Sequence, residues 1–155
     1  MTAPLRVLDP ADTARAPAGV SERATRWPGL EMQLHALVAG TAGVRAAVLA
    51  ERSGVKLASA PLSADASPHL LAAMSSSVLA IGAAMLDDAG LGACEDMVIE
   101  SDTGMIVLLR VADSELLLSV VTDRGAMLGE VLWAAKRCGR LLRAAVLAEL
   151  GAKAR

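Results

Sequence analysis

Aromatic side chains are almost absent from this chain of 155 residues, which has no Phe, no Tyr and two tryptophans, Trp27 and Trp133. Its formal net charge is −2. Proteins that bind nucleic acid use basic patches and stacking rings, and this composition supplies neither. The sequence therefore argues against a nucleic acid partner.

Groups that carry chemistry are also scarce. His35 and His69 are the only histidines, and neither has a His or Cys at metal-ligand spacing. There is no GxxxxGK[ST] loop, and Gly90-Leu91-Gly92 follows a predicted helix, whereas a dinucleotide fingerprint follows a strand. The serines at 75–77 lie near His69 but have no identified base, so close packing explains them better than nucleophilic catalysis. We predict no cofactor, no metal and no active site of the protein's own.

Cysteine is limited to Cys94 and Cys138, which lie far apart and outside any CxxC spacing. No apolar signal segment follows Met1. Both residues are therefore predicted to be reduced thiols in a cytoplasmic protein, with Cys138 in the core on the apolar stripe of a helix.

Charge is missing altogether from residues 66–86, which contain no Asp, Glu, Lys or Arg. Ser67 and Pro68 suit the start of a helix, and the apolar residues after them recur at helical spacing on two stripes. One stripe is Leu71, Met74, Val78, Ile81 and Met85, the other is Ala72, Ser76, Leu79, Ala83 and Leu86, and the remaining arc is small and uncharged.

A helix without a charged face must be covered on both sides, and a domain of this size rarely has enough of itself to do so. We therefore expect a homodimer through this helix, with the first stripe, Leu71, Met74, Val78, Ile81 and Met85, at the interface. A membrane span is the rival interpretation. The serines, the acidic flanks Asp65, Asp87 and Asp88 and the missing aromatic belt argue against it.

The periodicity of the whole chain predicts the class α+β. The expected elements are a helix at 30–38, strands at 44–49 and 55–58, the charge-free helix, strands at 96–100, 105–111 and 115–122, and a helix at 126–150. Short connections make the five-stranded sheet antiparallel, and helices must cover both faces. The result is a three-layer α/β/α sandwich of order αββαβββα, in which the charge-free helix covers one face alone.

Charges are unevenly placed along the chain. Residues 30–123 hold 4 basic and 12 acidic residues, whereas residues 124–155 hold 7 basic and 2 acidic ones. The two regions could attract each other within the chain or mark separate partner surfaces. On the last helix, Trp133, Lys136, Arg140 and Arg143 lie off the apolar stripe and form a candidate partner-binding surface, although a solvated helix face beside the acidic sheet is the simpler interpretation.

The order of elements and several segments resemble the roadblock (dynein light chain) family, particularly its bacterial members. The segments are 43–49 leading into Ser53-Gly54, 106–113 and 128–131. The resemblance covers residues 30–147. It implies a roadblock-like domain at 30–150, followed by a short tail at 151–155. The prolines and scattered charges before this domain, without a sustained period, predict a flexible N-terminal extension at 1–29.

The resemblance implies a homodimer in which the central helices pair and two sheets join into one. It also implies binding to a small Ras-like GTPase, as a scaffold or as a GTPase-activating polarity regulator. Arg52 and Arg110 are the formal arginine-finger candidates, but repositioning of the GTPase's own switch residues is the expected mechanism. The alternative function is a small-molecule sensor with a pocket between sheet and helix.

Overall fold

The computed structural model describes residues 27–61 and 66–153. It confirms the predicted class and element order. The elements are α1 (Pro28–Gly40), β1 (Val44–Glu51), β2 (Lys56–Ser59), α2 (Pro68–Asp88), β3 (Asp96–Glu100), β4 (Met105–Arg110), β5 (Leu116–Thr122) and α3 (Leu128–Lys153).

The five strands form one antiparallel sheet in the order β2-β1-β5-β4-β3. β1 and β5 lie in the middle and are buried along almost their whole length. Strands covered on both faces read as continuous apolar runs rather than as alternating ones. This explains why 46–50 and 116–118 carry apolar side chains at every position.

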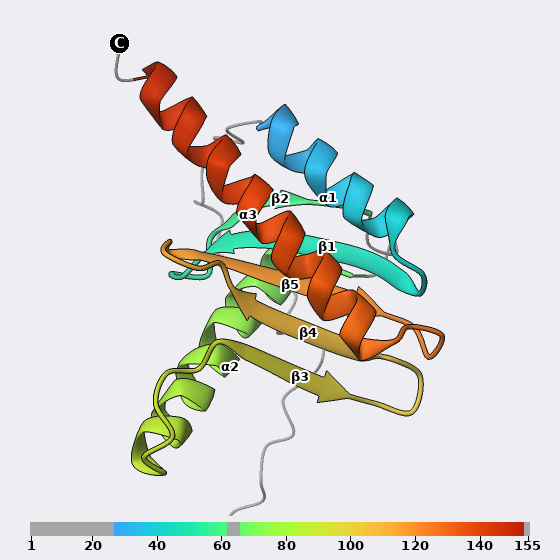
Figure 1. The fold of residues 1–155 in the computed structure, drawn as a ribbon, viewed down its shortest axis with the longest axis vertical. Helices are drawn as coiled ribbons and strands as arrows, with labels where there is room; N and C mark the ends of the chain where they lie inside the picture. The colour runs from blue at the N-terminus through green and yellow to red at the C-terminus, as the bar shows by residue number, and fades with distance from the viewer. Residues whose placement is uncertain (1–26, 62–65, 154–155) are drawn as a thin grey trace, which may run out of the picture.

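Helices cover the sheet in two unequal layers. Figure 1 shows α1 and α3 side by side on one face and α2 on the other, where it is the only helix of the described residues. The larger core lies under α1 and α3, around Leu34, Leu118 and Leu142. Two smaller clusters lie under α2, around Leu79 and Ala72. The prediction that the charge-free helix covers one face alone is therefore confirmed.

Both terminal helices are longer than predicted. Pro28 and Gly29, which the sequence had assigned to the extension, form the first turn of α1, where a proline loses nothing because its missing N–H would have had no partner within the helix. α3 begins at Leu128, two residues later than predicted, and continues to Lys153, so residues 151–153 are helical. The rest of the predicted extension, residues 1–26, lies outside the described residues.

Glycines fix two tight connections. Gly54 closes the β1–β2 turn with φ of +89°, as its position after Arg52-Ser53 predicts. Gly43 precedes β1 with φ of +78° and lies so close to the backbone of Ala126 that a Cβ would collide with it. This contact brings the start of α3 against the start of β1.

Candidate interaction surfaces

The outer face of α2 is apolar and exposed. The inner side of the helix buries Ala72, Ser75, Leu79 and Gly82 against the sheet. On the opposite side, Leu70, Met74, Ile81 and Met85 are 60%, 56%, 61% and 67% exposed. We call these four residues, with the small exposed residues Ala73, Ser77 and Ala84 between them, the α2 face.

The five residues predicted for the dimer interface divide between two environments. Met74, Ile81 and Met85 lie on the α2 face. Leu71 and Val78 are half-buried and pack against the two small clusters beneath the helix. The predicted stripe is therefore rotated away from the outward direction, and only three of its members point fully into solvent.

Leu70 is the large residue of the α2 face that is not among the five predicted interface residues. It lies on the arc outside the two predicted stripes, where its neighbours are Ala and Ser. The structure shows that this arc, rather than the flank with Leu71 and Val78, completes the outward face. The sequence carries no mark of this direction, since all three arcs are uncharged and only the structure shows that Ala72 and Leu79 face inward.

Hydroxyl groups fix α2 on the sheet. The Ser119 hydroxyl on β5 donates to the Ser75 hydroxyl at 2.8 Å, and both side chains are buried. The Ser76 hydroxyl donates to the carbonyl of Arg52 in the β1–β2 turn at 2.5 Å. Every buried side-chain nitrogen or oxygen of the described residues has a partner. These bonds set the rotation of the helix, because turning it would leave Ser119 unsatisfied.

By length and composition, α2 is the one helix of the described residues that could cross a membrane, and 22% of its most apolar window is buried within the protein. To span a bilayer, the helix would have to leave the sheet and uncover Leu79, Leu108 and Leu117. The packing of its inner side explains its composition without a membrane.

An unpaired sheet edge accompanies the α2 face. β3 is one of the two terminal strands of the sheet, so one side of its backbone has no partner strand among the described residues. Ile99 on this strand is 43% exposed. Exposed edge strands are ready to pair with another chain.

The basic residues predicted on α3 behave in two ways. Lys136 forms a 2.6 Å ion pair with Asp96, and the hydrogen bond and charge of this carboxylate raise the pKa of Lys136. Arg143 approaches Asp113 at 3.5 Å. These two cations are therefore neutralised by acidic residues of the same chain.

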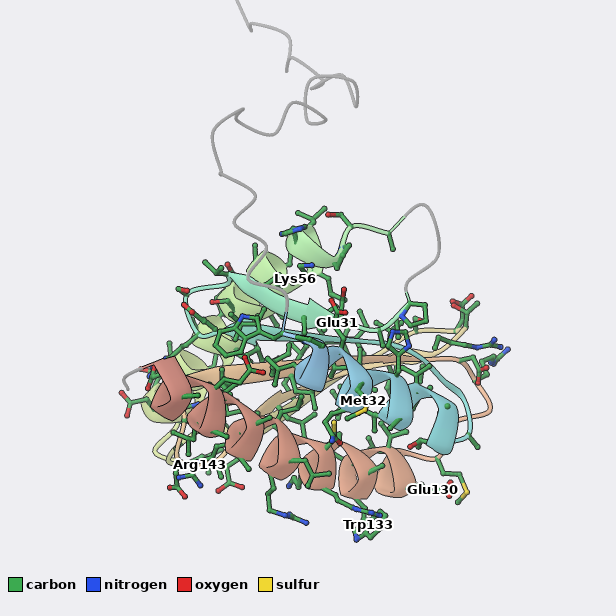
Figure 2. The ribbon with its side chains drawn as sticks, turned by 90° about the horizontal axis from the view of Figure 1, so that it is seen from above. Glu31, Met32, Lys56, Glu130, Trp133 and Arg143 are labelled. Carbon is green, nitrogen blue, oxygen red and sulfur yellow. The ribbon has the colours of Figure 1, made fainter. Side chains whose placement is uncertain are left out.

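Arg140, in contrast, is exposed, and no ion pair of the described residues includes it or its neighbour Arg137. Arg137 lies over the Trp133 ring at 5.6 Å from the ring centre. Trp133 is 64% exposed, and Figure 2 shows it projecting from the outer side of α3, away from the sheet. Arg137 is not among the residues predicted for the partner-binding surface, although its spacing of four from Trp133 predicts the contact.

A cleft of about 840 Å³ lies between α3, the start of β3 and the β4–β5 turn. Its walls carry Lys136, Arg140 and Arg143 as well as Asp96 and Asp113. Most of these charges pair with each other across the cleft. It is the hollow in which a sensor ligand would have to bind.

The two arginine-finger candidates lie at the same end of the sheet, on or beside the two strands that flank the start of β5, because Glu51 is opposite Leu116 and Arg110 is opposite Leu117. Arg52 is exposed in the β1–β2 turn, where it approaches Glu115 at 3.6 Å. Arg110 is exposed at the end of β4. No group of three potential metal ligands occurs among the residues that the structure describes.

Both thiols are buried and unpaired. Cys138 lies in the larger core, as predicted, and burial raises its pKa to about 11. Cys94 lies beneath α2 in one of the smaller clusters. Neither cysteine lies on an exposed surface.

The element order and the single helix on one sheet face define the class of three-layer roadblock-like sandwiches. The family model described as Roadblock/LC7 domain matches residues 30–122, and the chain belongs to this family. No curated protein matches the chain.

Solved structures share the fold at low sequence identity. The Roadblock/LC7 domain from Streptomyces avermitilis is 19% identical with a TM-score of 0.69, over 76% of this chain and 97% of that one. Myxococcus xanthus MglB is 17% identical with a TM-score of 0.66, over 76% and 87%. A structure described as MglB with a tetrameric arrangement is 22% identical with a TM-score of 0.66, over 77% and 91%.

Proposed function

We propose that the protein is a homodimer that pairs its α2 helices and binds a small Ras-like GTPase as a regulator or scaffold. The observation that carries the proposal is the α2 face, on which four large apolar side chains are each more than half exposed and no charge occurs among residues 66–86. A surface of this kind is typical of a protein interface.

Dimerisation would cover the exposed apolar side chains of the α2 face. Covering an exposed Leu, Ile or Met side chain contributes roughly 1 kcal/mol or more, and a twofold axis doubles the number of side chains covered. Ala73, Ser77 and Ala84 are small enough to let two helices approach closely. The free edge of β3 offers a second contact for the same partner copy. The tetrameric arrangement of one MglB structure supports self-association in this fold.

The GTPase partner follows from membership of the roadblock family together with the resemblance to its bacterial regulators. The two finger candidates are an ion-paired turn residue and an exposed strand-end residue, which favours repositioning over a directly acting arginine. We therefore propose that any stimulation of hydrolysis comes from repositioning the GTPase's own residues.

The sensor alternative has weaker support. The cleft beside α3 is large enough for a small molecule, but its lysine and one of its arginines already pair with acids of the same chain. A ligand would have to break these pairs to bind there.

The test uses the full chain and the small Ras-like GTPase encoded nearest to its gene. Binding is measured by calorimetry with the GTPase in its GTP-analogue and GDP forms, and single-turnover GTP hydrolysis is measured with and without the protein. We expect tighter binding to the GTP-analogue form. The GTPase proposal is refuted if neither nucleotide form of the GTPase binds detectably and the rate of GTP hydrolysis is unchanged.

A matched pair of variants links binding to the α2 face. Ile81→Asp places a charge on that face, whereas Met32→Asp places the same charge at an equally exposed apolar position on α1, in the opposite layer. If GTPase binding depends on the dimer, the first variant loses it and the second keeps it.

A further inference from the structure

A second protein-binding surface lies on the outer side of α3, in the layer opposite the α2 face. We propose that Trp133, Arg137 and Arg140 bind an acidic segment of a partner protein, in which an apolar side chain lies close to carboxylates. The three residues form a line along the helix because they are spaced by four and three positions. The inference does not rest on the GTPase proposal, since it uses other residues on another face.

The cations on α3 indicate that the partner is negatively charged. The exposed side of α3 carries four cations from Lys136 to Arg143. Asp96 and Asp113 pair with Lys136 and Arg143, and no acid of the described residues pairs with Arg137 or Arg140. Two guanidinium groups therefore remain to receive carboxylates, and charge-assisted bonds from Arg are among the strongest that a surface can offer.

Trp133 supplies an apolar anchor beside these cations. An exposed Trp offers a large contact area at a low entropic cost, and Trp and Arg dominate the energetics of protein interfaces. Arg137 holds the indole ring from one side at 5.6 Å. Trp133 and Arg137 therefore present one continuous contact surface to a partner.

A shallow groove next to Trp133 provides a place for the partner's apolar side chain. It has a volume of about 220 Å³ and lies between α1 and α3, with Ala36 and Gly40 on one wall and Trp133 and Leu141 on the other. Arg137 also borders this groove, whereas Arg140 borders the charged cleft on the other side of α3. A segment lying along the helix could fill the groove and place carboxylates on both arginines.

The acids beside α3 favour a narrow segment over a membrane. The cleft beside Arg140 is lined by four acids, Glu95, Asp96, Asp113 and Glu115. A bilayer with anionic lipids is wide and would also be brought against this cleft, where Glu95 has no ion pair among the described residues and opposes the surface potential of the lipids. A peptide that follows α3 is narrow enough to avoid Glu95.

The experiment selects short random peptides displayed on phage against the full chain, with the variant Arg137→Glu/Arg140→Glu as the counter-selection target. Selected peptides are synthesised with a fluorescent label, and their affinities are measured by anisotropy at low and high salt. Arg124→Glu is the matched control, because Arg124 is exposed outside α3 and has no ion pair among the described residues.

We expect the selected peptides to be acidic and to contain a large apolar residue. Their affinity should fall about tenfold in Arg140→Glu and in Trp133→Ala, weaken with salt, and stay unchanged in Arg124→Glu. Circular dichroism of each variant checks that the fold is kept.

Failure to select any peptide over the double variant would overturn the proposal, as would peptides that bind the two proteins equally. Vesicles of phosphatidylcholine with and without phosphatidylserine are measured alongside. If no acidic peptide is selected and the phosphatidylserine vesicles bind in a manner that Arg140→Glu abolishes, the surface is a membrane contact and the proposal is wrong.

Discussion

At the scale of single residues, the arginines show how surroundings limit what a side chain can do. Arg52 approaches Glu115 across a turn, and Arg110 is exposed at the end of β4, where it borders the cleft beside α3. Both side chains are exposed, whereas an arginine finger requires a guanidinium held at a defined place against the transferred phosphoryl group.

The first prediction concerns these two arginines. In GTP hydrolysis assays with the neighbouring GTPase, Arg52→Ala and Arg110→Ala should each keep the stimulated rate close to that of the unchanged protein. Removal of a true finger lowers the rate by about 10³ or more. A loss of that size in either variant would show that the arginine acts directly and that repositioning is the wrong mechanism.

The second prediction concerns Cys138. Burial raises its pKa from 9.0 to about 11, so the folded protein holds almost no thiolate near pH 8, and Cys94 is equally shielded from solvent. A thiol reagent should therefore label neither residue quickly at about pH 8 in the folded protein and both after denaturation. Labelling of Cys138 should accelerate as the pH rises towards its pKa.

Fast labelling of Cys138 in the folded state would show that the helix pair α1–α3 opens readily. The raised pKa also has a consequence for stability. Between pH 9.0 and about 11, the thiol ionises in the unfolded chain but remains protonated in the folded one, so its ionisation lowers the free energy of unfolding as the pH rises through this window.

At the scale of elements, helix and strand positions could be predicted because each period in the sequence matches one kind of packing. The continuous apolar runs of β1 and β5 reflect burial on both faces, and the return of helical spacing after residue 126 marks α3. The helix ends were less predictable, because Pro28-Gly29 reads equally well as a linker or as a first helical turn.

The rotation of α2 could not be read from its sequence. All three arcs of the helix are uncharged, so no polar face marks the outward direction. The direction is set instead by Gly82, which lets Met97 approach, and by the bond between Ser75 and Ser119. Only the tertiary structure brings these residues together.

The third prediction tests this bond. Ser75→Ala removes the partner of the buried Ser119 hydroxyl and should lower the free energy of unfolding by about 1–3 kcal/mol. The double variant Ser75→Ala/Ser119→Ala should be more stable than that single variant, because no hydroxyl is then left unsatisfied. Urea unfolding at a fixed protein concentration measures both, with Ser53→Ala in an exposed turn as the control.

The double variant could instead have a lower free energy of unfolding than Ser75→Ala, by as much as an independent loss of the Ser119 hydroxyl would cause. The two hydroxyls would then not be coupled. The rotation of α2 would then have to be fixed by apolar packing alone.

At the scale of the whole molecule, the sheet separates two exposed surfaces of different character. The α2 face is apolar and uncharged, and Trp133 projects from the opposite layer (Figure 2) beside Arg137 and Arg140, which have no ion pair among the described residues. A scaffold needs this kind of separation, because partners bound to opposite layers do not compete for space. The sequence indicated both surfaces, but it could not show that Lys136 and Arg143 are neutralised within the chain, since their partners Asp96 and Asp113 are distant in sequence.

Self-association through α2 is the property on which the proposed function depends, and the molar mass in solution measures it. Sedimentation equilibrium of the full chain at micromolar concentration should give twice the mass of one chain, with Met32→Asp unchanged and Ile81→Asp reduced to a folded single chain. A well-folded single chain for the unsubstituted protein, or an Ile81→Asp variant that stays a dimer, would contradict the account.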